Sequence, residues 1–253
     1  MKIIVAACAL VLTAATGVAA QSVDPPVFTI SYAVRARGID VGGATYALSV
    51  RNRTYQATFA RRMTGPARTL LGASQDFTYS AQGQVDADGQ IRPVAYQHQG
   101  GRGHRVVHVA FAGDQITTIA TPVMGMGHPP ATQAQKAGAI DQVSMFAQML
   151  MVHGAPCRQS VRVFMDGRTR FDLVFSPNGR QRVSIAGFRG DAFRCSVQFQ
   201  PVAGFSDPQQ PARLTFLFAP LNGYFVPLSI EMPTDDVGIV RLEARTFRIE
   251  ISR

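Results

Sequence analysis

Apolar and polar residues alternate along most of this chain, which is the pattern of β-strands with one buried face. The alternation is clear from Val27 to Val34 and from Tyr46 to Val50. Turn-forming residues such as Asp86-Ala87-Asp88-Gly89 and Gly113-Asp114 separate the strands. Strands do not alternate with helices, so the pattern predicts an antiparallel sheet and not a parallel α/β sheet. Further strands are expected over residues 55–61, 77–81, 93–96, 107–111, 116–119, 161–165, 171–175, 182–188, 192–200, 212–219, 225–232 and 237–251.

One segment has a helical period instead. Between Asp141 and Pro156 apolar residues recur at intervals of three and four. Asp141 suits the N-cap position, because its carboxylate can accept from the free amides of the first turn. Gly154 and Pro156 are stop signals. The stripe is formed by Val143, Phe146, Met149, Leu150 and His153.

The expected fold is mainly β, with this helix at its centre. We expect a single long, curved or spiral antiparallel sheet, open in part like an incomplete barrel, wrapped around the one α-helix. After the helix, Asp166-Gly167 favours a tight hairpin turn, because both residues tolerate positive φ. Residues 121–138 are rich in glycine and proline and predict a long loop, either a crossover or a lid.

The N-terminus predicts export. Residues 1–20 read as a signal peptide, with Lys2 at the start, an apolar run and small residues at Val18-Ala19-Ala20. Lipidation at Cys8 is an alternative use of this segment. Removal of the signal leaves residues 21–253, which we interpret as a single periplasmic domain. No later stretch is long and apolar enough to cross a bilayer, so an integral membrane protein is not expected.

The cysteines agree with an exported protein. Cys8 leaves with the signal peptide, so the mature chain retains Cys157 and Cys195. Two cysteines in an oxidising compartment predict one disulfide. Cys195 alternates with Val197 and Phe199, so it should face the core and tie the end of the helix to an inner strand. The spacing is far from the Cys-x-x-Cys of a reactive thiol pair.

The charge balance suggests the kind of partner. The net charge is +9, from 25 Lys and Arg against 16 Asp and Glu. This excess favours an anionic envelope component such as phospholipid head groups or lipopolysaccharide phosphates. The basic residues are spaced singly, however, which is also typical of a solvated outer face. No face combines basic and aromatic residues, so nucleic acid is not an expected partner.

Two groups of residues are candidates for chemistry. His98, His104 and His108 could bind zinc, since His104 and His108 would share one face of a strand; three surface histidines are the simpler interpretation. Methionines gather at the helix and the loop before it, and methionine adapts to irregular apolar shapes. They could fill gaps in a closed core or line an acyl-chain cavity. The possible cavity-lining residues are Met145, Phe146, Met149 and Leu150.

Several fragments, in order and spacing, resemble the exported bacterial family called domain of unknown function 3108. The resemblance covers nearly all of the mature chain, although Phe218 and the Gly- and Met-rich loop 121–138 depart from the family pattern. It implies a periplasmic, mostly β protein without an established activity. The fragments are Gly83-x-x-Asp86-x-Asp88-Gly89-x-x-x-Pro93-x-x-Tyr96, the helix ending at Pro156-Cys157, Val163-Phe164-x-Asp166-Gly167-Arg168, Phe171-Asp172-Leu173, Cys195-x-Val197-x-Phe199-x-Pro201-Val202-Ala203-Gly204-Phe205, Phe216-x-Phe218-Ala219-Pro220 and Val226-Pro227-Leu228-x-Ile230.

These features together predict a non-enzymatic periplasmic protein of the cell envelope. We expect it to bind or scaffold a lipid, a glycan or a partner protein, with no cofactor and no bound metal. The alternative is a secreted metal-dependent hydrolase that uses His98, His104 and His108.

Overall fold

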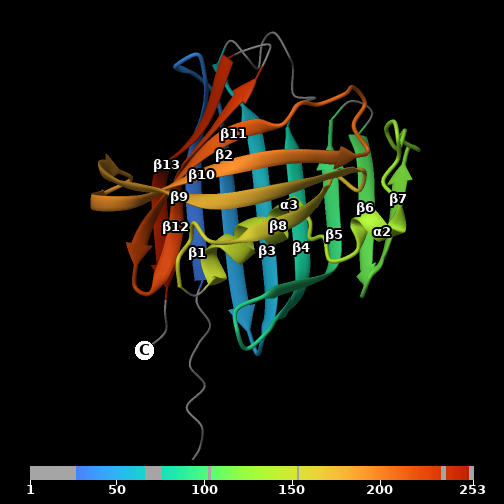
Figure 1. Cartoon of the computed structure of the whole chain (residues 1–253), viewed down its shortest axis with the longest axis horizontal. Coiled ribbons are helices and arrows are strands. Elements are labelled where there is room, and N and C mark those ends of the chain that lie inside the picture. Colours follow the sequence, from blue (N-terminus) through green and yellow to red (C-terminus); the bar gives the residue numbers. More distant parts are fainter. Residues whose placement is uncertain (1–26, 66–75, 102–103, 153, 235–237, 251–253) are drawn as a thin grey trace, which may run out of the picture.

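The computed structural model describes residues 27–65, 76–101, 104–152, 154–234 and 238–250 (Figure 1). The predicted signal peptide, with Cys8, and His153 at the end of the predicted helix lie outside these residues. The described part of the chain is mainly β, as the alternation predicted. Its strands are β1 (Val27–Ala36), β2 (Ile39–Arg51), β3 (Thr54–Met63), β4 (Phe77–Val85), β5 (Ile91–Gly100), β6 (Arg105–Ala112), β7 (Gln115–Thr121), β8 (Ser160–Met165), β9 (Thr169–Ile185), β10 (Phe188–Ala203), β11 (Ala212–Leu221), β12 (Tyr224–Thr234) and β13 (Gly238–Glu250).

These strands form one antiparallel sheet that does not close into a barrel. The strand order is β7-β6-β5-β4-β3-β2-β1-β13-β12-β11-β10-β9-β8, so β7 and β8 are its edges. The first strand pairs with the last, from Val27 opposite Glu250 to Ala36 opposite Val240. This pairing joins the β1–β7 half of the sheet to the β8–β13 half. In Figure 1 β9, β10 and β11 of the second half run across strands of the first half, whereas β13 lies beside β1.

Local sequence explains most of the strands and turns. In β1 the alternate residues Phe28, Ile30 and Tyr32 are at most 2% exposed. The Asp166-Gly167 turn has positive φ at both residues, 54° and 69°, as predicted for a two-residue hairpin.

The prediction was wrong between residues 171 and 188. Instead of two strands, β9 is one continuous strand that passes through the polar segment 176–182. The chain turns only at Ala186 and Gly187, whose φ angles are 52° and 84°. Hydrogen bonding to β10 holds the polar segment in the strand although it has no apolar face of its own.

The main helix, α3 (Gln142–Met151), begins where predicted. Oδ1 of Asp141 accepts from the amides of Val143 at 2.9 Å and Ser144 at 2.8 Å. The helix is buried on nearly every side, since nine of its ten residues are buried, and not along a single stripe. It contacts β3, β4 and β5 from one half of the sheet and β8 and β12 from the other.

Polar side chains fix the orientation of α3 in the core. The Tyr55 hydroxyl lies 2.6 Å from Oγ of Ser144, which donates to Oδ2 of Asp141 at 2.5 Å. Gln148 accepts from the amide of Ile91 at 2.8 Å. Each buried polar group on the helix thereby meets a partner on the sheet or on the helix itself.

The predicted loop 121–138 contains a second short helix, α2 (Gln133–Lys136), which the sequence interpretation missed. Thr132 and Gln135 form a capping box at its start. Nε of Arg170 on β9 donates to the carbonyl of Gln135 at 2.7 Å, and Nζ of Lys136 lies 5.2 Å from the centre of the Phe164 ring. These contacts attach the segment to the second half of the sheet.

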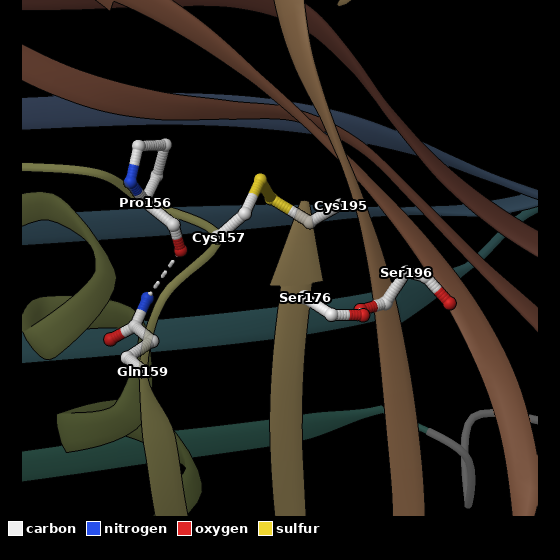
Figure 2. Close-up of a disulfide and its surroundings, with 6 residues drawn as sticks. All are labelled: Pro156, Cys157, Gln159, Ser176, Cys195 and Ser196. Atoms are coloured by element: carbon white, nitrogen blue, oxygen red, sulfur yellow. Dashed lines mark hydrogen bonds between the residues drawn. A yellow bond between two sulfur atoms is a disulfide. The ribbon is translucent and has the colours of Figure 1, made fainter. Parts of the chain in front are cut away.

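The predicted disulfide between Cys157 and Cys195 is confirmed (Figure 2). It joins the loop after α3 to β10, with Cα atoms 5.2 Å apart and a sequence separation of 38. Cys195 has no exposed surface, in agreement with its predicted inward orientation. The loop-entropy relation gives a stabilisation on the order of 3–4 kcal/mol for a closed loop of this length.

Candidate functional site: a neutral groove on the outer face of the sheet

Strands β3–β7 have an inner face toward α3 and an outer face on the opposite side. Because side chains alternate along a strand, neighbouring residues belong to different faces. Tyr96 on β5 points inward and accepts from Nε2 of Gln142 on α3 at 2.5 Å. The next residue, Gln97, is therefore on the outer face, as are alternate residues of the other four strands.

The outer face has a groove with a volume of about 490 Å³. The strand register arranges its side chains in two rows that cross five strands. Since neighbouring strands lie about 4.8 Å apart, each row is roughly 19 Å long. One row is Gln56, Gln82, Ala95, Ala110 and Thr117; the other is Thr58, Ser80, Gln97, His108 and Ile119.

The groove combines polar side chains with small apolar ones and has almost no charge. Three glutamines, two threonines and a serine supply amide and hydroxyl groups, which both donate and accept hydrogen bonds. Ala95 and Ala110 are small, and they lie between longer side chains in the middle of one row. The lining residues include no Asp, Glu, Lys or Arg, and His108 is the single histidine among them. This chemistry suits reversible binding of a neutral polar molecule.

The next row along the strands continues the neutral surface. It contains alanine, threonine, glutamine and valine, and it crosses the same five strands in register. A chain with a net charge of +9 thus has a broad sheet face without a formal charge. The residues of this row are Ala60, Thr78, Gln99, Val106 and Thr121.

The three histidines proposed as metal ligands do not lie together on one face. His98 is 6% exposed and points to the inner face, whereas His108 is exposed on the outer face and lines the groove. His104 precedes β6 in a turn with a φ of 49°, so the prediction that it shares a strand face with His108 was wrong. Among the described residues, no group of three or more His, Cys, Asp or Glu could hold a metal ion.

His98 belongs to a polar cluster behind the groove. Its Nδ1 lies 3.3 Å from the Tyr96 hydroxyl and 3.6 Å from Oδ1 of Asp166. Nε2 of Gln142 donates to Oδ1 of Asp166 at 2.6 Å. Burial lowers the pKa of His98, Arg105 lowers it further, and Asp166 opposes both effects. The cluster connects β5 to α3 and to the β8–β9 turn, and so positions the strand that carries Gln97.

The residues predicted to line an acyl-chain cavity are all on α3 and buried. Met145 and Phe146 are 8% and 7% exposed, and Met149 and Leu150 have no exposed surface. The Phe146 ring lies 5.3 Å from the Tyr46 ring, 5.6 Å from Phe59 and 6.4 Å from Tyr32, measured between ring centres. The groove is lined by none of these four helix residues. An acyl-chain site here stays a prediction, and it would require the side chains to separate.

An aspartate is buried at the start of α3. Asp141 has no exposed surface, and burial raises its pKa to about 6, although hydrogen bonds from Ser144 and Val143 act in the opposite direction. Its acceptors are occupied by the helix amides and by Oγ of Ser144. Asp141 therefore acts as a structural cap, and it does not face the groove.

In comparisons with known proteins, no family model and no curated protein matches this chain. The resemblance to domain of unknown function 3108 therefore stays a prediction. In the described ranges, no helix is long and apolar enough to span a membrane.

The sequence interpretation missed the groove. Its glutamines, threonines and serine alternate with core residues in segments such as 54–60 and 78–84, but each polar residue alone is an ordinary exposed strand position. A usable signal was present, since the exposed positions of five consecutive strands contain no Asp, Glu, Lys or Arg within the three rows. Only the strand register shows that these positions are side by side.

Proposed function

We propose that this chain is a non-enzymatic binding protein of the bacterial cell envelope, exported to the periplasm, whose outer groove on β3–β7 binds a neutral glycan. The observation that supports the proposal is the uncharged, amide- and hydroxyl-lined groove across five strands. A linear ligand would lie across the strands, along the two rows of side chains.

The groove chemistry favours a glycan over the other ligands expected from the sequence. An acyl chain requires an apolar pocket that encloses it, whereas this groove is open and long amide side chains flank it. An anionic ligand requires cationic or otherwise positive partners, and the rows have no lysine or arginine. A sugar presents hydroxyl groups that donate and accept, which matches glutamine, threonine and serine.

The proposal can be tested by NMR titration of residues 21–253 with neutral hexasaccharides: chitohexaose, cellohexaose and maltohexaose. We expect saturable shifts of amide signals on β3–β7 with at least one of them. The double variant Gln82→Ala/Gln97→Ala should bind roughly 10-fold more weakly, since each lost hydrogen bond is worth about 0.5–1.5 kcal/mol and 1.4 kcal/mol is tenfold in affinity.

A matched control changes two exposed glutamines elsewhere, Gln181→Ala/Gln200→Ala on β9 and β10. This variant should bind as tightly as the original chain. The proposal fails if none of the three oligosaccharides produces saturable shifts, or if the shifts map to residues outside the groove.

We also propose the finer architecture expected from the sequence, a sheet that spirals around α3 as its central helix. Its support is the burial of nine helix residues and the contacts of α3 with both halves of the sheet. Hydrogen exchange should give the amides of α3 the protection of global unfolding. Exchange of α3 at the rate of the hairpin ends would contradict this architecture.

A further inference from the structure

The distal part of the β9–β10 hairpin is a two-stranded arm. β8 pairs with β9 only as far as Val174, and β11 pairs with β10 only from Phe193 onward. Residues 181–185 and 188–192 therefore pair only with each other. In Figure 1 this arm projects on the left, past β12 and β13.

The two faces of the arm differ in chemistry. On one face Val183, Ile185 and Phe188 are partly buried against the core, and Ala192 is fully buried. β9 also contacts β13, so the body of the protein covers part of this face. Residues opposite each other in an antiparallel pair share a face. Arg180, Arg182 and Arg189 therefore all project from the other face, where all three are exposed.

The arginines of the arm are not neutralised. Neither Arg182 nor Arg189 forms an ion pair with any described residue, and Asp191, which lies opposite Arg182, is the only acid between residues 176 and 196. With Arg194 included, this segment has a net charge of +3. Arg182 and Arg189 also line a shallow depression of about 340 Å³ together with Val183, Ser184 and Gly190.

Several other arginines on the sheet differ from Arg182 and Arg189 because they form ion pairs. Arg35 on β1 and Arg241 and Arg245 on β13 each contact one or more carboxylates at 2.6–2.9 Å. The acids there are Asp40, Glu231 and Glu243. Arg182 and Arg189 lie beside one depression on a projecting arm without such a carboxylate, so an external anion at that place would complete the pairing.

We propose that the arginine face of the β9–β10 arm docks on an anionic phospholipid surface, with lipid phosphates at the depression between Arg182 and Arg189. Guanidinium groups bind phosphate oxygens in a bidentate manner. The face does not suit a single-stranded nucleic acid, which needs an open aromatic platform. Phe193 is the aromatic residue on this face, and the Arg180 guanidinium covers it at 4.3 Å from the ring centre. The proposal is independent of the glycan groove, which is on other strands.

The test is co-sedimentation of residues 21–253 with vesicles of 30% phosphatidylglycerol in phosphatidylcholine, and with pure phosphatidylcholine, at 100 mM NaCl. We expect binding to the anionic vesicles only. The variant Arg180→Gln/Arg182→Gln/Arg189→Gln should lower the partition coefficient roughly 100-fold, because each basic residue near an anionic surface contributes about a factor of 5.

A matched control removes the same charge elsewhere, as Arg51→Gln/Arg53→Gln/Arg62→Gln on β2, β3 and the turn between them, where all three side chains are exposed. It should change vesicle binding less than 5-fold. Circular dichroism and thermal unfolding verify that both variants are folded. The proposal is overturned by equal binding to neutral vesicles, by equal losses in the two variants, or by binding to soluble polyphosphate but not to anionic vesicles.

Discussion

The inner and outer faces of strands β3–β6 are made by neighbouring residues of the same strands, yet they differ in chemistry. On the inner face, Tyr55 and Tyr96 are buried, and their hydroxyls meet Ser144 and Gln142 on α3. On the outer face, the adjacent Gln56 and Gln97 are in an open groove. The inward positions of each strand thus contribute to stability, and the outward positions contribute to the proposed binding. Single substitutions can therefore test the two roles separately.

The largest effect is expected on the inner side, at Phe146. Phe146→Ala should lower the free energy of unfolding by about 3–5 kcal/mol, because it leaves a cavity among the rings of Tyr32, Tyr46 and Phe59. Urea denaturation measures this value. A loss below about 1 kcal/mol would mean that the core beside α3 is loosely packed, and it would favour the acyl-chain cavity expected from the sequence.

The next effect depends on pH, and it tests whether the carboxyl of Asp141 is shielded from water on the inner side. The unfolded Asp141 carboxyl loses its proton near pH 3.8, whereas the folded one does so near pH 6. Between these values the folded state binds more protons, so the free energy of unfolding falls as pH rises from about 4 to about 6. At 1.36 kcal/mol per pKa unit the whole shift is worth about 3 kcal/mol, of which about 2 kcal/mol is lost between pH 4 and pH 6.

Asp141→Asn removes this titration while it keeps an N-cap residue. The difference in unfolding free energy between the two proteins should therefore change by about 2 kcal/mol from pH 4 to pH 6. Taking the difference cancels the titration of His98, whose lowered pKa makes stability rise with pH. A difference that does not depend on pH would contradict the raised pKa of Asp141.

The smallest effects come from a matched pair of glutamines. Gln148→Ala should cost about 1–3 kcal/mol, because it leaves the buried amide of Ile91 without its acceptor. Gln97→Ala should change stability by less than about 0.5 kcal/mol, because it removes a groove side chain from the outer face. Thermal and urea unfolding of the two variants give both values. Equal losses would mean that the outer glutamine is also structural.

Sequence predicted the elements of the fold better than their arrangement. Alternation located nearly all the strands, and the Asp141 cap located the start of α3. The prediction from alternation failed in β9, because residues 176–182 have no buried alternate positions and form a strand only by pairing with β10. It also failed for His98 and His108, because two strands in register place them on opposite faces, which composition cannot reveal.

The sequence alone determined what depends on local chemistry: strands from the alternation of apolar residues, a tight turn from Asp166-Gly167, and a disulfide expected between Cys157 and Cys195. The tertiary structure decided which polar positions become neighbours. Gln56, Gln82 and Gln97 are many residues apart, and they share one groove only because hydrogen bonding sets the register of three strands. The arginines of the β9–β10 arm are likewise distinguished from the paired ones only by which carboxylates the folded sheet brings near them, since ion pairing depends on distance in space and not along the chain.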